Sequence, residues 1–391
     1  MALVGPETLP GWPSRLADAL RRWRDARISD PRFQAWAAAF PLTRGLVRRR
    51  SAALHQIVSG FVQSQVLAAA VELDLFKHVS AAPLSAGEIA AATGLPPDGA
   101  RRLAQAAAAL DFLVLRRDGR YGLGPLGAVM IGAPGLMEIV RHHRLFYKDL
   151  ADPVALLRGP ETTALSQFWA YVAPDEGGGL PEAAAAYSRV MTETQAMVAA
   201  ETLATGALHG VRHLLDIGGG EGAFVSAALA NDPALRGTVF DLKPVAELAA
   251  ARLSAAGLST RATAIGGSFR TDPLPTGADA VSLIRVAYDH SDATVAALLA
   301  RIFDHLPPGG RLILSEPMSG GDRPSLAGDV YFGMYTAAMT SGTPRSAAAH
   351  TRLLQAAGFV SVRTPRTRNP MITSVVTARK PNPAAHTSKP Q

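Results

Sequence analysis

The chain has 391 residues, 48% of them hydrophobic and 18% charged, so it is long enough for two domains and a large core. It contains no cysteine, which excludes a disulfide framework, a thiolate metal site and a thiol nucleophile. It has no apolar run of about eighteen residues and no secretory signal layout, so the sequence predicts a cytoplasmic protein that does not span a membrane.

Residues 1–50 form an N-terminal extension in which the positive charge is concentrated. Residues 1–60 carry ten arginines against four acidic residues, which is nearly the whole net excess of +7. Three of the four tryptophans, Trp12, Trp23 and Trp36, lie there too. Arginine with tryptophan suits a membrane interface, where indole rings sit at headgroup depth and cations meet anionic lipid. An arginine-rich segment packed on the protein surface or on a dimer partner explains the composition equally well.

Residues 51–130 carry a helical pattern that ends in a hairpin. Ser85 and Glu88 have the spacing of a capping box, and the turn Asp118-Gly119 joins two short apolar strands. A winged helix of this kind can bind DNA. Its third helix, over 101–110, is mostly alanine and has no Asn, Lys or extra Arg to read base edges, so we expect no nucleic-acid partner.

Residues 131–205 read as helices that bridge two domains. Their aromatic and sulfur-containing side chains are candidates for lining a substrate pocket, although aromatics at helical spacing more often form core. The candidates are His142, Phe146, Trp169 and Met191.

Residues 206–380 alternate between strand and helix, which predicts an α/β fold with a doubly wound, Rossmann-like parallel sheet. The strands are expected near 212–217, 237–241, 262–266, 279–286, 310–316, 359–364 and 371–378. The helices are expected near 221–231, 244–256, 293–306, 327–341 and 346–357. The last two strands suggest a terminal antiparallel hairpin, and residues 381–391 read as a disordered tail.

A glycine-rich loop follows the first strand of this sheet. Gly218, Gly220 and Ala223 fit the dinucleotide pattern, whereas Asp216, Gly218, Gly220 and Gly222 fit the D-x-G-x-G-x-G pattern of S-adenosylmethionine sites. A carboxylate here would repel a pyrophosphate but attract the amino group of a methionine moiety, which favours the methyl donor. A glycine-rich turn without a ligand is the plainer alternative.

Asp241 ends the next strand, where the ribose diol of either ligand would lie. It could equally cap the following helix. The ten histidines are scattered without metal-ligand spacing, so we expect no metal.

The order of these parts resembles the small-molecule O-methyltransferases of the caffeate and hydroxyindole type, over about residues 50–380. The resemblance implies a winged-helix dimerisation domain, a homodimer, S-adenosylmethionine as donor and no metal. The stretches 266–270, 286–292 and 315–321 look most like carotenoid O-methyltransferases of purple bacteria. They imply a hydrophobic acceptor, a 1-hydroxy acyclic carotenoid of the spheroidene type, and a place at the inner (photosynthetic) membrane. A phenolic or polyketide acceptor, or donor binding without catalysis, are the alternatives.

The resemblance also assigns residues to the donor site. Gly218 matches the loop glycine that contacts the donor, and Asp241 matches the ribose acid. Ser268 stands where the family usually has an aspartate near the adenine, beside Phe269, which can stack on the purine. Leu242 and Arg285 complete the expected donor-binding set.

The catalytic positions depart from the family pattern. The family's catalytic histidine is replaced by Tyr288, and Glu316 matches the acid that usually supports that histidine. A second supporting acid is replaced by Pro344. We expect Tyr288 or His290 to face the acceptor, with Asp289 and Glu316 in support; His142 or His143 could serve as base instead. The helix carrying Tyr331 and Tyr335 offers an aromatic wall for an elongated acceptor, or plain core.

Overall fold

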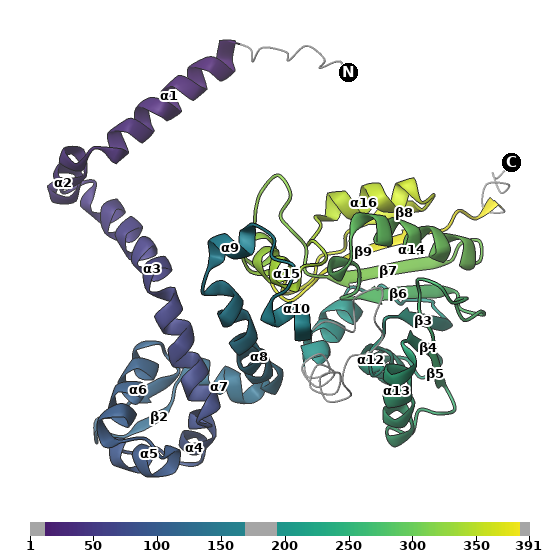
Figure 1. Cartoon of the computed structure of the whole chain (residues 1–391), viewed down its shortest axis with the longest axis horizontal. Helices are drawn as coiled ribbons and strands as arrows, with labels where there is room; N and C mark the ends of the chain where they lie inside the picture. The colour runs from purple at the N-terminus through teal and green to yellow at the C-terminus, as the bar shows by residue number, and fades with distance from the viewer. Residues whose placement is uncertain (1–11, 169–193, 384–391) are drawn as a thin grey trace, which may run out of the picture. The chain divides into compact units, whose positions relative to one another are not determined.

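The computed structural model describes residues 12–168 and 194–383 (Figure 1). The chain divides into two compact units, Met1–Leu126 and Gly127–Gln391. Among the described helices, none is both long and apolar enough to cross a membrane.

The first unit begins with three helices, α1 (Trp12–Ser29), α2 (Pro31–Ala39) and α3 (Arg44–Glu72). Pro13 and Pro31 fall in the first turns of α1 and α2, where a missing N–H costs nothing, so they start helices rather than break them. The carboxylate of Asp30 caps α2 by accepting from the N–H of Arg32. Helix α3 is continuous through residue 50, so the expected division at that residue lies inside a helix.

The rest of this unit is the predicted helical bundle and hairpin. It contains α4 (Leu75–Ala81), α5 (Ala86–Thr93), α6 (Pro97–Ala109), β1 (Leu113–Leu115) and β2 (Tyr121–Leu123). The capping box of Ser85 and Glu88 forms as predicted and fixes the start of α5. Leu75, Phe76 and Ile89 are fully buried and make up much of its core.

One face of α3 stays uncovered. Leu54, Ile57, Val58, Phe61 and Val62 are all exposed, and their spacing places them on one side of the helix. An apolar stripe of this kind indicates a surface that another protein chain covers.

The second unit is built on a seven-stranded sheet with the order β5-β4-β3-β6-β7-β9-β8. Its strands are β3 (His213–Ile217), β4 (Arg236–Asp241), β5 (Ala262–Gly266), β6 (Ala280–Ile284), β7 (Arg311–Glu316), β8 (Val360–Arg363) and β9 (Ser374–Arg379). The first five are parallel, while β9 is antiparallel to both β7 and β8, which confirms the predicted doubly wound sheet and its terminal hairpin.

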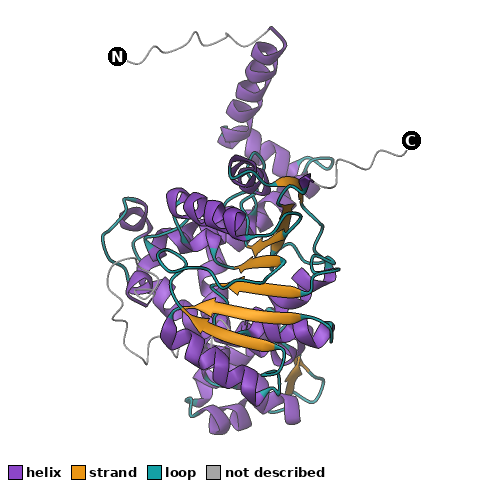
Figure 2. Ribbon diagram, turned by 90° about the vertical axis from the view of Figure 1, so that its right-hand side faces the viewer, coloured by secondary structure: helices purple, strands orange, loops and turns teal. Residues whose placement is uncertain are grey.

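Helices cover both faces of the sheet (Figure 2). They include α12 (Ala223–Asn231), α13 (Lys243–Ala255), α14 (Asp292–His305) and α16 (Ala347–Ala356). One buried cluster includes Leu215 and Leu283, and a second includes Leu214 and Phe224, so neighbouring residues of β3 pack into different clusters, as the alternation of a strand requires.

The helices that precede the sheet are α7 (Pro125–Gly132), α8 (Pro134–Leu150), α9 (Pro153–Leu157), α10 (Ala164–Phe168) and a helical run over 194–204. The single helix predicted near 327–341 is instead a π-helix, η3 (Leu326–Phe332), followed by α15 (Gly333–Met339). A π-turn shifts the side chains after it around the axis, and such turns often occur at functional sites.

The strand order reverses at β3, which has β4 on one side and β6 on the other. In a doubly wound sheet a crevice opens at this point, beyond the carboxyl ends of the strands. The residues that follow β3, β4, β6 and β7 therefore define the candidate site.

Candidate functional site

The glycine loop after β3 has a backbone that only glycine adopts readily. Gly218, Gly220 and Gly222 have φ angles of 65°, 57° and 76°. A Cβ on Gly218 would lie 2.8 Å from Val286, whereas a Cβ on Gly220 would meet nothing within 4 Å. The backbone at Gly220 is therefore open to a close approach by a ligand.

Asp216 lies beneath this loop rather than on its surface. Its side chain is fully buried, and Oδ1 accepts a hydrogen bond from the Ser282 hydroxyl at 2.5 Å. Oδ2 has no hydrogen-bond partner, and burial raises the pKa of the carboxyl to about 7. An unpaired buried carboxyl oxygen below an open glycine loop fits a cationic or N–H-bearing ligand group above it.

Asp241, at the end of β4, holds the other side of the loop. Oδ2 accepts from the N–H of Gly220 at 2.8 Å, and Oδ1 accepts from the N–H of Leu242 at 2.7 Å. Burial raises its pKa. Each oxygen keeps a lone pair that a ribose hydroxyl can use, so the residue can hold the loop and bind a diol at once. It does not cap α13, since the N-cap of that helix, Leu242, has no side-chain hydrogen bond.

Ser268 and Phe269 follow β5 and remain partly exposed. The ring of Phe269 meets His290 edge to face at 5.3 Å, and the Arg270 guanidinium lies 5.8 Å from its centroid. His290 is 7% exposed, and burial together with Arg270 and Arg345 lowers its pKa to about 4. The imidazole of His290 therefore packs beside the candidate purine position.

The turn that carries Tyr288, at the position where the resemblance implies a catalytic histidine, is the single-turn helix η2 (Ala287–Asp289). Tyr288 is only 1% exposed, and its N–H donates to Oε2 of Glu316 at 3.0 Å. Its hydroxyl bonds the carboxyl of Asp289, whose pKa burial raises well above its usual range. Glu316 thus supports Tyr288 through the backbone rather than through the hydroxyl.

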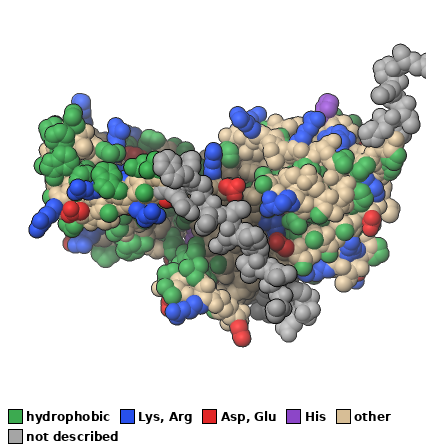
Figure 3. Space-filling model, turned by 90° about the horizontal axis from the view of Figure 1, so that it is seen from above, with side chains coloured by type: hydrophobic (Ala, Val, Ile, Leu, Met, Phe, Trp, Pro, Cys, Tyr) green, Lys and Arg blue, Asp and Glu red, His purple; other side chains and the backbone are tan. Residues whose placement is uncertain are grey.

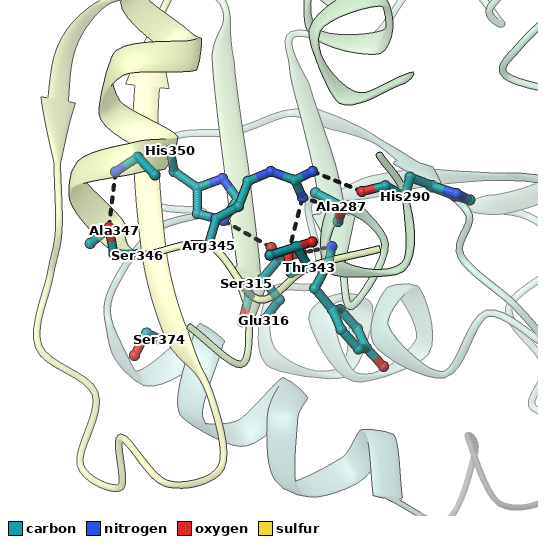
Figure 4. A network of polar contacts seen from close by, with 12 residues as sticks. Ala287, His290, Ser315, Glu316, Thr343, Arg345, Ser346, Ala347, His350 and Ser374 are labelled. Atoms are coloured by element: carbon teal, nitrogen blue, oxygen red, sulfur yellow. Dashed lines mark hydrogen bonds and ion pairs between the residues drawn. The ribbon is translucent and has the colours of Figure 1, made fainter. Parts of the chain in front are cut away.

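Arg345 fixes this turn from the opposite loop (Figure 4). Its buried guanidinium donates to the carbonyl oxygens of Ala287 at 2.7 Å and His290 at 2.8 Å, and pairs with Asp292. Beside it, Gly342 has a φ of 76°, and a Cβ there would lie 2.1 Å from the carbonyl oxygen of Tyr288. The sequence pattern gave no sign of this arginine, because its partners, two carbonyl oxygens and one carboxylate, lie more than fifty positions away.

Glu316 has a second partner that the sequence analysis missed. Nε2 of His350, on α16, lies 2.9 Å from Oε1 of Glu316, and both side chains are fully buried (Figure 4). The pair is an ion pair when the imidazole is protonated. A lone histidine in an apolar helix pattern carries no signal for such a contact.

Arg285 directly follows β6 with a φ of 60°, which is uncommon for a residue other than glycine. Its guanidinium donates to the Thr194 hydroxyl at 2.6 Å and offsets part of the rise that burial causes in the pKa of Asp289. The positively charged guanidinium of Arg285 is therefore held between Thr194 and the turn that carries Tyr288.

The candidate substrate residues gather in one aromatic cluster formed by α8, η3 and α15. Nε2 of His142 lies 2.7 Å from the Tyr335 hydroxyl, and the ring of Phe146 meets that of Tyr335 at 5.3 Å. The ring centroids of Tyr331 and Phe146 lie 6.2 Å apart. Trp169 and Met191 lie outside the described residues.

In the described ranges, no group of three or more histidine, aspartate or glutamate side chains is arranged to hold a metal ion. The structure thus brings Asp216, Asp241, Ser268, Phe269 and Arg285 to one edge of the sheet, with the turn of Tyr288 beside them.

Two family models match the chain. The model of the O-methyltransferase domain matches residues 147–360, and that of the O-methyltransferase dimerisation domain matches residues 55–132. The chain is 48% identical to demethylspheroidene O-methyltransferase of Cereibacter sphaeroides over 95% of this chain and 98% of that protein. It is 45% identical to the enzyme of the same name from Rhodobacter capsulatus, over 87% of this chain and 85% of that one. The crystal structure of human N-acetylserotonin methyltransferase with SAM has the same fold, with a TM-score of 0.74 at 24% identity, covering 85% of this chain and 98% of that one.

Gly220→Ala should weaken donor binding by roughly tenfold or more, because its new methyl group projects into the open space above the loop. The matched control is Gly257→Ala, which has a similar φ of 69° and equally open surroundings, but lies in the turn after α13. Both variants should lose about 1–2 kcal/mol of stability from the left-handed backbone. Calorimetric titration with S-adenosylmethionine and urea unfolding measure the two effects; equal donor affinity in both variants would contradict the assignment.

Arg345→Met should lower the free energy of unfolding by about 2–4 kcal/mol, because two buried carbonyl groups lose their donor. It should also reduce methyl transfer, since the turn carrying Tyr288 loses its anchor. Arg352→Met, an exposed arginine nearby in sequence on α16, is the control and should change stability by under about 0.5 kcal/mol. Urea unfolding compares the two, and equal effects would show that Arg345 does not anchor the turn.

Proposed function

The chain belongs to the family of S-adenosylmethionine-dependent O-methyltransferases, and on that premise we propose that it methylates the tertiary hydroxyl of a 1-hydroxy acyclic carotenoid. The observation that carries this proposal is the near-complete overlap with the two demethylspheroidene enzymes at 45–48% identity. The aromatic cluster of α8, η3 and α15 supports it, because a long polyene needs an apolar, aromatic wall.

In this proposal the donor is held by the carboxyl edge of the sheet. Asp216 and the glycine loop lie under its methionine part, Asp241 accepts from its ribose, and Leu242, Ser268 and Phe269 border its adenine, with Arg285 at the inner end. When bound, the donor supplies a methyl group on a positively charged sulfur. The residues around it exclude water and orient the two reactants, which is the main source of rate in such a displacement.

The acceptor lies on the other side of this edge. His142, Phe146, Tyr331 and Tyr335 form its wall in our proposal, together with Trp169 and Met191. Tyr288 closes the pocket next to the reacting centre, Asp289 holds the Tyr288 hydroxyl, and Glu316 holds its backbone. His290 lies on the donor side, against Phe269. No metal has a role in this scheme.

We also propose that the protein is a homodimer. The chain contains the family's dimerisation domain, and the stripe of Leu54, Ile57, Val58, Phe61 and Val62 on α3 begins at the edge of that match. Its apolar surface is large enough to make solvent exposure unfavourable. A second copy of α3 is the partner that we expect to cover it.

Helix α1 supports a peripheral contact with the inner membrane. Leu16, Leu20 and Trp23 are exposed on one face, with Trp23 64% exposed. At about 100° per residue, Asp18 and Asp25 fall on the opposite face. Figure 3 shows hydrophobic and basic side chains interspersed at the left of the view, over the N-terminal unit. Such a face suits an anionic lipid surface, where the carotenoid is dissolved.

A turnover assay with radiolabelled S-adenosylmethionine tests the reaction. We expect label in a detergent-dispersed 1-hydroxy carotenoid and none in caffeate or a flavonoid. A chelating agent should leave the rate unchanged, because no metal takes part. Label in a phenol alone would overturn the acceptor assignment, and loss of activity with chelator would overturn the metal-free scheme.

The two surfaces of the N-terminal unit can be separated by paired variants. Leu20→Ser with Trp23→Ser should reduce flotation with phosphatidylglycerol vesicles by roughly tenfold or more and leave the dimer intact. The same change at Asp18 and Asp25 is the control and should not reduce flotation. Ile57→Asp with Phe61→Asp should give a monomer in light scattering. Flotation of wild type equally with neutral phosphatidylcholine vesicles, or not at all, would contradict the lipid proposal.

A further inference from the structure

Two histidine–tyrosine pairs lie side by side in the aromatic cluster. His142 and His143 are consecutive on α8, and their Nε2 atoms lie 2.7 Å and 2.6 Å from the hydroxyls of Tyr335 and Tyr331. The tyrosines are four positions apart, one at the end of η3 and one in α15. Each imidazole therefore meets its own phenol.

The two pairs differ in their surroundings. Tyr335 is buried in the cluster with Met339 and Leu165, whereas Tyr331 and His143 are partly exposed. The pair of His143 and Tyr331 is therefore the more accessible of the two to a bound acceptor.

A chain of ring contacts also connects the His143–Tyr331 pair to η2, the turn that carries Tyr288. Tyr331 meets Phe332 edge to face at 4.8 Å, and Phe332 meets the ring of Tyr288 at 6.0 Å. Tyr331 and Tyr288 thus lie on the same aromatic wall, with the ring of Phe332 between them.

The protonation states are set by burial. The pKa of His143 is lowered to about 4, and that of Tyr331 is raised, in both cases mainly by desolvation. The imidazole is therefore neutral and the phenol protonated near neutral pH. The Tyr331 hydroxyl donates to Nε2 of His143, and its oxygen keeps lone pairs for a second hydroxyl.

The two side chains at the family's catalytic position are already engaged. The Tyr288 hydroxyl is bonded to Asp289. Nδ1 of His290 lies 3.3 Å from Arg270, which can only donate, so Nδ1 is the acceptor and the proton of the neutral ring is on Nε2. His290 therefore offers no free basic nitrogen to an acceptor hydroxyl.

We propose that Tyr331 binds the acceptor hydroxyl and that the Tyr331–His143 pair takes its proton. As the new C–O bond forms, the C–S bond breaks and its electron pair stays on sulfur. The acceptor proton passes to the Tyr331 oxygen while the Tyr331 proton passes to Nε2 of His143. The resulting imidazolium releases the proton to solvent. The inference rests on the proposed function, since it requires an alcohol acceptor.

A weakly basic imidazole is sufficient for this acceptor. A tertiary alcohol is a poor acid, so its proton leaves late, once the oxygen carries most of a positive charge. A protonated ether is a far stronger acid than an imidazolium ion, and proton transfer to even a desolvated histidine is then downhill.

The test compares His143→Gln and Tyr331→Phe with the matched variant His142→Gln. We expect each of the first two to lower kcat about a hundredfold or more, with calorimetric donor affinity changed by less than about threefold. The double variant should lose no more than either single one, because the pair acts as a unit. His142→Gln should act on KM, as a wall residue does.

The pH profile is the second readout. The titratable and charged groups that face the pair are His142 and Tyr147 on α8, Tyr335 on α15 and Arg285 after β6. With a base of pKa about 4, kcat of the wild type should stay constant from pH 8 down to about pH 5.5. A fall in kcat centred at about pH 6.5 would instead indicate a base with the pKa of an ordinary imidazole and overturn the assignment.

The failure of this inference differs from a failure of the proposed function. If the wild type methylates the carotenoid and both His143→Gln and Tyr331→Phe retain their kcat, the pair is not the proton acceptor. If the wild type methylates no alcohol although it binds the donor, the proposed function itself is wrong.

Discussion

Three buried carboxyl groups beneath the carboxyl edge of the sheet impose the constraint on which the site depends. Asp216, Asp289 and Glu316 are all buried. Burying such groups is unfavourable unless neighbours compensate for the lost water. Asp216 is bonded by a serine hydroxyl and Asp289 by the adjacent tyrosine, whereas Glu316 is held by a backbone N–H and by the imidazole of His350. Of the three, Asp216 and Asp289 keep an oxygen without a hydrogen-bond partner.

The tyrosine at position 288 affects more of the site than its own side chain. A histidine there would compete for Glu316, which in this chain is shared between the Tyr288 backbone and His350. With tyrosine, the acid becomes a support for the turn, and the hydroxyl is held by the adjacent Asp289. Tyr288 thus contributes to the shape of the site, whereas the imidazoles of His142 and His143 lie on α8.

The sheet and its loop could be predicted from the sequence because their signals are local. Strand and helix alternate in short runs, the glycines of the loop lie next to Asp216, and the capping box at Ser85 spans four residues. The contacts of Arg345 and His350 could not be predicted, because they join residues that only the tertiary fold brings together. The change from η3 to α15 was missed because a π-turn of seven residues is too short to stand out from the helical pattern around it.

Gly342 has a consequence for how this protein could acquire new acceptors. Its left-handed backbone lies against the carbonyl of Tyr288 with no room for a side chain, and Arg345 ties the same two loops together. The turn that carries Tyr288 and the loop that carries Gly342 and Arg345 therefore form a single rigid piece, in which few substitutions are tolerated. Diversification of substrate range is left to the aromatic side chains of α8 and η3 other than His143 and Tyr331, which can be exchanged one at a time without disturbing that piece.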